Sequence, residues 1–207
     1  MYTPSHYEET RPEALHDVLV KHPLGVLVTC GSQGLDANHL PFELDAAAGI
    51  LRAHVARRNP VWQQVAQGDE VLVVFRADEA YISPSWYPTK HETGRQVPTW
   101  NYRVVHVHGR ITVHDDEKYV RGVVARLTRR HEADQPVPWK MGDAPAAYID
   151  EELKAIVGIE IAVTRMVGKF KLSQMEETRD RVGAGEALVR RGEPALGHAM
   201  LDAKPFL

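Results

Sequence analysis

The alternation of apolar and polar residues predicts a chain built mainly of β-strands. Short apolar runs separated by Gly and Asp turns fill residues 25–55, as in an antiparallel meander. Further strands are expected at residues 70–77, 102–114 and 158–172, where apolar side chains form continuous runs or recur at every second position. No regular alternation of strand and helix is present, so a closed antiparallel barrel of about six strands is favoured over a parallel sheet.

Apolar residues at helical spacing predict short helices around these strands. They are expected at residues 10–22, 60–67, 115–130 and 148–157. From Ser173 onward the composition becomes polar and rich in Ala and Gly, which favours a helical segment lying over the barrel or over a neighbouring subunit. We therefore expect a barrel domain of residues 1–174 and a C-terminal helical extension of residues 175–207.

Residues 81–102, YISPSWYPTKHETGRQVPTWNY, form the segment richest in candidate binding groups. Three prolines prevent it from being one helix or one long strand. Its aromatic rings supply flat apolar walls, while hydroxyls, an amide and cations supply directional contacts. This mixture suits a site for a planar, partly anionic small molecule. The alternative interpretation is that the segment only joins the packed ends of two strands.

Two further segments carry groups that bind anions. Residues 56–60, ARRNP, lie where a strand ends and a helix begins, so two guanidinium groups and free helix amides would meet there and suit a phosphate. Alternatively, Asn59 is only an N-cap and the arginines are only solvated. Lys169 and Lys171 share one side of a strand. Ser173 and Gln174 follow this strand, and their side chains can hydrogen-bond to a phosphate or to the edge of a ligand. A solvated strand end is the alternative there.

Histidine and cysteine are the residue types most relevant to a metal site. His39, His54, His106 and His108 lie in predicted strands, but no tight group of cysteines or carboxylates accompanies them. Cofactor contacts or hydrogen bonds inside the barrel are therefore favoured over a metal. Cys30 lies in the apolar run GVLVTC and is expected to be a buried thiol without a catalytic role.

Composition and charge narrow the classes of partner. Hydrophobic residues make up 43% of the 207-residue chain and charged residues 26%, as in an ordinary globular protein. The formal net charge of -3 makes direct binding to nucleic acid doubtful, because such binding needs a basic surface. No targeting signal or run of about 20 apolar residues is visible, so we expect a cytoplasmic protein without membrane contact. Glycine-rich phosphate loops and nucleophile elbows are also absent from the sequence.

Several motifs, taken in order, resemble the PaiB-like family of FMN-binding proteins, which are usually described as negative transcriptional regulators. They are MYTPSHY at the start, His54 with RRNP, YISPSWY, VPTWNY followed by VHVHG, and GKFKLSQ, and together they extend to residue 174. The resemblance implies a six-stranded antiparallel split β-barrel like that of the pyridoxamine-phosphate oxidases, mainly β with peripheral helices. It also implies a homodimer with FMN at the subunit interface.

The resemblance further implies which residues contact FMN. Arg57, Arg58 and Asn59 would hold the phosphate, and His54 would lie beside the ribityl chain. The isoalloxazine ring would be lined by Ser83, Trp86, Thr99, Trp100 and Asn101, with Lys171 and Gln174 approaching from the partner subunit.

Three functions are compatible with these expectations. The family description favours a flavin-bound homodimer that represses transcription. An FMN-dependent oxidoreductase or flavin reductase is the alternative, and it is supported by the acidic chain and by the lack of a recognisable DNA-reading element. Haem binding through one of the histidines on a related barrel is the third. The sequence assigns no catalytic residue.

Overall fold

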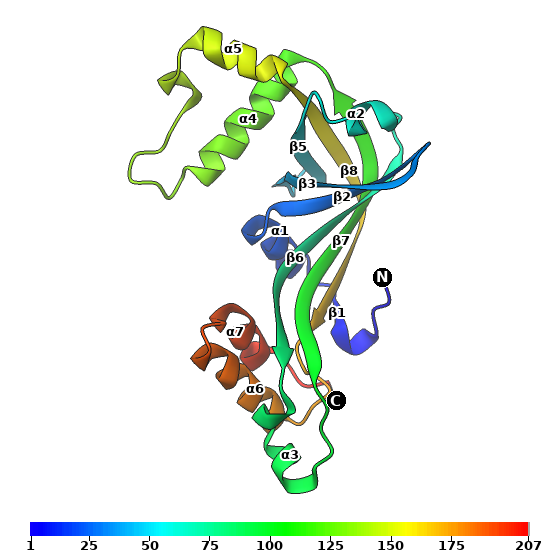
Figure 1. Cartoon of the computed structure of the whole chain (residues 1–207), viewed down its shortest axis with the longest axis vertical. Coiled ribbons are helices and arrows are strands. Elements are labelled where there is room, and N and C mark those ends of the chain that lie inside the picture. The colour runs from blue at the N-terminus through cyan, green and yellow to red at the C-terminus, as the bar shows by residue number, and fades with distance from the viewer. Residues whose placement is uncertain (207) are drawn as a thin grey trace. The chain divides into compact units, whose positions relative to one another are not determined.

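The computed structural model describes residues 1–206, which form one antiparallel sheet with helices around it (Figure 1). The strands are β1 (Glu8–Glu9), β2 (Leu24–Gly31), β3 (Gly34–Pro41), β4 (Glu43–Asp45), β5 (Ile50–Ala56), β6 (Glu70–Ile82), β7 (Thr99–His114) and β8 (Ile156–Lys171). The helices are α1 (Pro12–Lys21), α2 (Val61–Gln64), α3 (Pro88–Thr93), α4 (Glu117–His131), α5 (Ala146–Lys154), α6 (Thr178–Arg190) and α7 (Pro194–Asp202), with 3₁₀ turns η1 (Ser5–Tyr7), η2 (Pro84–Trp86) and η3 (Met141–Asp143).

The strands follow the order β3-β2-β6-β7-β8-β5-β4, and β1 pairs with β8. The pairs β2–β3, β2–β6, β4–β5, β5–β8 and β1–β8 are all antiparallel, which confirms the expected antiparallel sheet with peripheral helices. The sheet has eight strands within residues 1–206 rather than about six. Two of them, β1 and β4, contain only two and three residues and are too short to show an alternating pattern.

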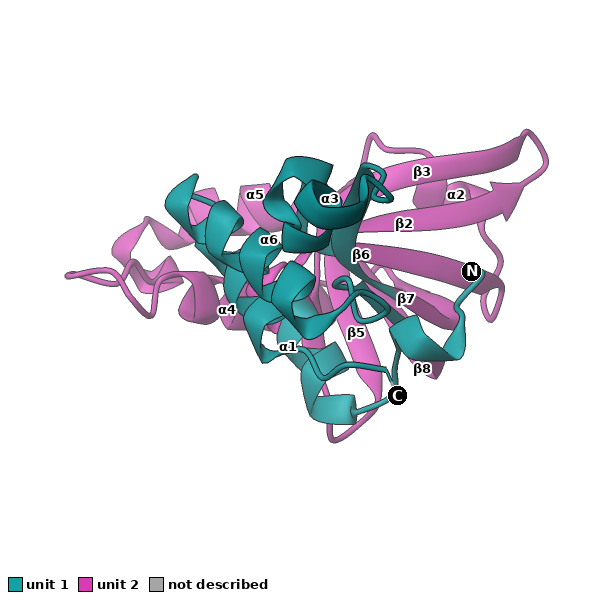
Figure 2. Cartoon of the chain, turned by 90° about the horizontal axis from the view of Figure 1, so that it is seen from below, with its two compact units in different colours: residues 1–18, 76–105, 167–207 teal, residues 19–75, 106–166 magenta. Residues whose placement is uncertain are grey.

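The chain divides into two compact units (Figure 2). Unit 1 contains residues 1–18, 76–105 and 167–206, and unit 2 contains residues 19–75 and 106–166. The long strands β6, β7 and β8 contribute residues to both units. The domain boundary expected after residue 174 stays a prediction.

The core of unit 2 lies between the inward faces of its strands and the helices α4 and α5. Alternate residues of β7 from Val107 to Ile111 are buried, as the period of two predicts. Phe42 packs edge-on against Phe75, with ring centroids 5.7 Å apart. Helices α4 and α5 share a buried cluster of Val120, Ile149 and Leu153. Of the apolar positions at helical spacing in residues 115–130, α4 buries Val120, Val123 and Leu127, whereas Val124 is only partly buried.

In unit 1, α6 and α7 pack closely because glycines face each other where the helices meet. A Cβ atom on Gly197 would lie 2.8 Å from the carbonyl oxygen of Gly185. Leu188 and Met200 are fully buried. The C-terminal segment is therefore helical, as predicted, and its buried Met200 contacts Asn101 of β7.

Two local expectations are wrong. Cys30 is exposed, because Leu27 and Thr29 occupy the buried face of β2 and Cys30 falls on the opposite face near the end of the strand. The helix expected at residues 60–67 is reduced to the four residues of α2.

No helix among residues 1–206 combines the length and the apolar character that a bilayer-spanning helix needs.

Candidate functional site

The turn after β5 in unit 2 holds the predicted phosphate ligands. The strand ends at Ala56, whose carbonyl oxygen accepts a hydrogen bond from the Asn59 backbone N–H at 2.8 Å. The side chain of Asn59 is a turn cap, because its Oδ1 accepts from the Val61 N–H at 3.0 Å. Its Nδ2 donates to Asn38 Oδ1 at 2.6 Å. Both ends of the Asn59 amide are therefore engaged in holding the turn, as the N-cap interpretation predicts.

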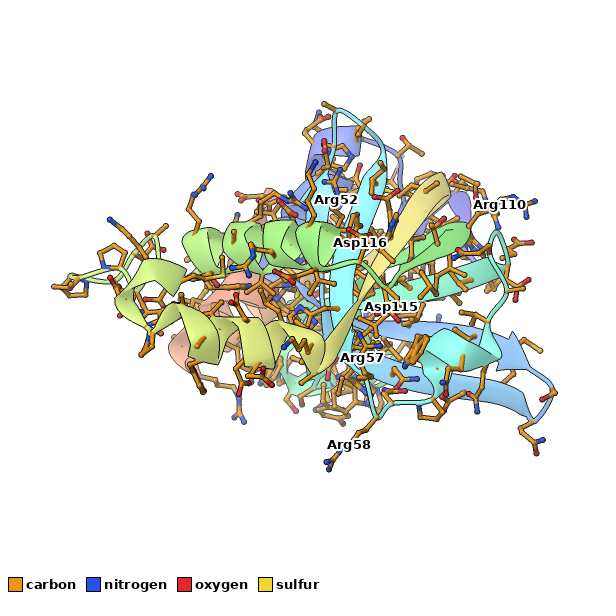
Figure 3. All side chains as sticks on the ribbon, turned by 90° about the horizontal axis from the view of Figure 1, so that it is seen from above. Arg52, Arg57, Arg58, Arg110, Asp115 and Asp116 are labelled. Atoms are coloured by element: carbon orange, nitrogen blue, oxygen red, sulfur yellow. The ribbon has the colours of Figure 1, made fainter. Side chains whose placement is uncertain are left out.

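Arg57 already has an anionic partner in unit 2. Its Nη1 and Nη2 atoms donate to the two carboxylate oxygens of Asp115 at 3.0 and 2.5 Å (Figure 3). Its Nε donates to the carbonyl oxygen of Lys154 at 2.6 Å. The hydrogen bonds from Arg57 hold the pKa of Asp115 below its ordinary value. Asp115 thus fixes the position of this guanidinium, and a phosphate here would have to share Arg57 with a carboxylate.

Arg58 is the cation of this turn that remains open to an incoming anion. It is exposed, and no ion pair with it occurs among the described side chains. Its side chain points away from the Arg57–Asp115 pair (Figure 3). The expected contribution from free helix amides is weak, because α2 has only four residues and its first N–H is bonded to Asn59. Of the two arginines in this turn, Arg58 is therefore the one without a carboxylate partner among the described side chains, and its contact with the phosphate stays a prediction.

His54 lies on β5 opposite Gly158 of β8 and faces a hollow of about 310 Å³. The hollow is also lined by the C-terminal part of α4 and by Trp139. The Nδ1 atom of His54 is buried without a hydrogen-bond partner in the described part of the chain. Burial lowers the pKa of His54, so the imidazole is neutral near pH 7. A neutral imidazole has one donor and one acceptor nitrogen, so contact of His54 with a ribityl hydroxyl stays a prediction.

The buried His54 predicts that stability falls in mild acid. Its pKa is lower in the folded chain than in the unfolded chain, where it is about 6.5. The unfolded chain therefore binds more protons below that pH, and the free energy of unfolding decreases as pH falls from about 6.5 toward the folded pKa. In urea unfolding at pH 7.5 and 5.5, His54→Gln should lose less stability between the two pH values than the wild type. The exposed His198→Gln, in unit 1, should behave as the wild type, and an equal loss in all three proteins would contradict this role of His54.

In unit 1, Ser83 and Trp86 lie at the turn η2. Ser83 Oγ accepts from the Ser85 N–H at 3.3 Å and begins the turn. The guanidinium carbon of Arg191 lies 5.5 Å from the centre of the Trp86 ring. A hollow of about 320 Å³ is lined by Tyr81, Ser83, Trp86, Arg191 and Glu193. The predicted ring-binding residues Ser83 and Trp86 thus share one concave surface.

Thr99, Trp100 and Lys171 meet where β7 begins and β8 ends. Lys171 Nζ donates to Thr99 Oγ1 and, at 2.9 Å, to the carbonyl oxygen of Trp100. Burial lowers the pKa of Lys171. The Trp100 ring is 56% exposed and stands edge-on to Tyr81, with centroids 6.2 Å apart. An exposed tryptophan beside an anchored lysine suits a planar anionic ligand.

Asn101 and Gln174 lie behind this surface. Asn101 is fully buried, and its Nδ2 donates to Ser173 Oγ at 2.9 Å. Gln174 Oε1 accepts from the Leu172 N–H at 2.7 Å, and its Nε2 donates to the Phe170 carbonyl oxygen at 2.6 Å. These two amides hold the end of β8 within the chain's own unit 1. Their direct contact with FMN, and the approach of Lys171 and Gln174 from a partner subunit, stay predictions.

Arg191 and Glu193 were not predicted from the sequence to be site residues. The glycine between them could have marked the end of a helix, since Gly192 has a φ of 85°. No feature of the sequence places this turn beside Trp86, because the two segments are far apart along the chain.

Comparisons with known proteins also point to a protein that binds FMN. The family described as "Putative FMN-binding domain" matches residues 1–165. An uncharacterised protein of Emericella nidulans is 33% identical over 88% of each chain. The protease synthase and sporulation protein PAI 2 of Bacillus subtilis is 29% identical over 94% of this chain and 92% of its own length.

The fold is also that of solved flavin proteins. A FAD and haem binding protein from Mycobacterium smegmatis has a TM-score of 0.60 and 20% sequence identity, covering 80% of this chain and 73% of its own. This similarity shows the fold alone. The family match over residues 1–165, together with the PAI 2 relative, shows that the chain belongs to the PaiB-like family of FMN-binding proteins, with FMN as its cofactor.

Proposed function

We propose that the chain acts as a flavin-bound homodimer that represses transcription in response to its flavin. The observation that carries the flavin-binding part of this proposal is Arg58, an exposed guanidinium without an ion-pair partner among residues 1–206, placed beside Asn59 in a member of an FMN-binding family. The regulatory part of the proposal comes from the resemblance to the PaiB-like family, and the Bacillus subtilis relative is itself named a protease synthase and sporulation protein. The six-stranded split barrel implied by the motifs belongs to the same proposal.

The residues present fit the chemistry of FMN. In unit 2, Arg58 offers the charge and the forked donors that a phosphate requires, and the exposed Arg57–Asp115 pair lies next to it in the chain. In unit 1, Trp86 and Trp100 offer flat apolar surfaces, and Lys171 offers a cation. When bound, FMN supplies electron or hydride transfer, and the chain supplies binding, orientation and exclusion of water. The phosphate ligand in unit 2 and the ring-binding residues in unit 1 are two separate proposals, and each can be tested without the other.

Arg58→Ala should weaken FMN binding by roughly 1.5–3 kcal/mol, because it removes a charge-assisted contact with the phosphate. This corresponds to about a 10- to 150-fold rise in Kd, measured by quenching of flavin fluorescence. Riboflavin, which lacks the phosphate, should bind wild type and variant equally.

The matched control is Arg110→Ala, which removes another exposed arginine of unit 2 whose Nη1 donates to the Gly68 carbonyl oxygen (Figure 3). It should leave FMN affinity unchanged. If Arg58→Ala also leaves FMN affinity unchanged, the phosphate site lies elsewhere.

The arginines of α4 make direct reading of DNA by this helix unfavourable. Arg121 is paired with Glu117 at 2.8 Å and Asp150 at 2.6 Å, and Arg126 with Glu43 at 2.7 Å. These carboxylates neutralise two of the four arginines of the helix, which lowers the positive charge that a phosphate backbone would need. Repression would then act through a protein partner. The same observation favours the second candidate function, an FMN-dependent oxidoreductase.

Two assays separate these functions. A direct repressor binds promoter DNA with an affinity that falls steeply with salt, and no binding at low salt would exclude it. An oxidoreductase loses its flavin colour when a suitable donor is added to the loaded protein, and inertness toward a broad donor panel would count against it. Light scattering tests the homodimer, which should have twice the 23.2 kDa mass of one chain.

A further inference from the structure

The turn that follows α6 in unit 1 presents two oppositely charged side chains from a fixed backbone. The Arg191 N–H donates to the carbonyl oxygens of Ala187 and Leu188 at 3.1 and 3.0 Å. The Glu193 N–H donates to the same Leu188 oxygen at 3.0 Å. Gly192 between them has a φ of 85°, a conformation that favours glycine. The turn is therefore held by main-chain bonds, and its two charged side chains start from defined positions.

Helix α6 approaches the turn η2 closely because Gly183 has no side chain. A Cβ atom at this position would lie only 2.6 Å from the carbonyl oxygen of Trp86. This approach brings the Arg191 guanidinium to 5.5 Å from the centre of the Trp86 ring. The resulting hollow of about 320 Å³ lies within the size range of small-molecule sites.

The lining of this hollow selects for a particular ligand chemistry. Tyr81 and Trp86 supply aromatic surface, and Arg191 supplies N–H donors without any acceptor. Glu193 supplies acceptors, and the two charges cancel. An anionic ring would meet the carboxylate of Glu193, and a cationic ring would meet the guanidinium of Arg191. A carboxamide carries a carbonyl acceptor for the arginine and an amine donor for the glutamate, without net charge.

We propose that this hollow binds a planar aromatic carboxamide. Arg191 donates to the amide oxygen, and Glu193 accepts from the amide nitrogen. The ligand ring lies against Tyr81 and the edge of Trp86, since Arg191 lies over the Trp86 ring face. The inference deepens the proposed function, because Ser83 and Trp86 are also proposed to line the flavin ring, so the carboxamide would lie beside the flavin. Both charged residues lie outside residues 1–165, the part of the chain that the family description covers.

Three probes of nearly the same shape test the proposal: benzamide, benzoate and benzylamine. Their Kd values are measured by ligand-observed NMR on the full chain, both without FMN and with FMN added, at probe concentrations up to on the order of 10 mM. Benzamide should bind the wild type at least about tenfold more tightly than either charged probe.

Two variants that each remove one charge should change the order in which the three probes rank by affinity. Arg191→Gln leaves the glutamate unbalanced, so benzylamine should become the preferred probe. Glu193→Gln leaves the arginine unbalanced, so benzoate should become preferred. Arg190→Gln is the matched control, because Arg190 is exposed, lies one residue away and has its Nη1 atom 3.5 Å from Glu186. It should retain the wild-type order, and unchanged circular dichroism would show that all variants are folded.

The outcomes separate this inference from the proposed function. Equal binding of the three probes, no binding of benzamide, or an Arg191→Gln protein with the wild-type order would overturn the inference. An Arg191→Gln protein that retains FMN and reverses the probe order supports it. A wild type that binds benzamide in the expected order but does not bind FMN contradicts the proposed function and leaves the carboxamide site standing.

Discussion

Replacing Asp180 by Ala should lower the free energy of unfolding by about 3–5 kcal/mol, the largest effect that we expect. Asp180 is fully buried in α6, and its carboxylate accepts from the Thr89 backbone N–H at 3.0 Å and the Thr89 hydroxyl at 2.5 Å. Gln96 Nε2 also donates to it at 3.2 Å. The substitution would leave the two Thr89 donors without this acceptor in the interior, whereas Gln96 Nε2 keeps Glu176 as a partner. Urea denaturation followed by circular dichroism measures the loss.

Two comparisons isolate the contribution of the carboxylate. Asp180→Asn keeps one acceptor oxygen and should cost less than the alanine variant. Glu186→Ala removes an exposed carboxylate from the same helix and should have little effect. If Asp180→Ala unfolds at the same urea concentration as Glu186→Ala, the buried hydrogen bonds do not stabilise unit 1.

Arg181→Ala should cost about 3 kcal/mol, because it removes the buried donor that caps the end of α7. Arg181 is only 4% exposed, and its Nη1 donates to the carbonyl oxygens of Met200 and Leu201, the latter at 3.0 Å. Without the guanidinium, both carbonyl groups lose this donor and a cavity forms beside Met200. The loss is measured by denaturation, and hydrogen exchange should become faster in α7 than in the strands.

The control for this substitution is Arg179→Ala. Arg179 lies two residues earlier in α6, but its ion pair with Glu92 is about half exposed. It should have a small effect. Exchange in α7 that is as slow in Arg181→Ala as in Arg179→Ala would contradict the capping role.

Together these residues show how the C-terminal helices support the candidate site of unit 1. Asp180 ties α6 to the start of α3, which follows η2 directly, and Arg181 ties α6 to α7. The same helix ends at Arg190, and the next residue, Arg191, lies over Trp86. The C-terminal segment therefore contributes to the surface on which Ser83 and Trp86 lie.

Much of the fold was predictable from local sequence patterns. The alternation in β7 and the helical spacing in α4 each identify the buried face, because burial follows the period of the element. Burial of Cys30 was predicted wrongly, because an apolar run does not reveal which face of a strand a given residue occupies. Strands as short as β1 carry no periodic signal and form only through pairing with β8.

The candidate site was predictable only in part. Arginines at a strand end and tryptophans in a proline-rich loop are recognisable from residue type and spacing. The carboxylate that engages Arg57 was not predictable, because Asp115 reaches it through tertiary structure. Burial of Asn101 and the contribution of Arg191 likewise depend on packing between segments distant in the sequence.

The most direct test of the account is the visible absorption spectrum of the purified full-length chain after incubation with FMN and desalting. The account predicts retained flavin bands in the wild type and weaker bands in Arg58→Ala. A wild-type protein that leaves the column colourless, or that retains only a haem spectrum, would contradict it.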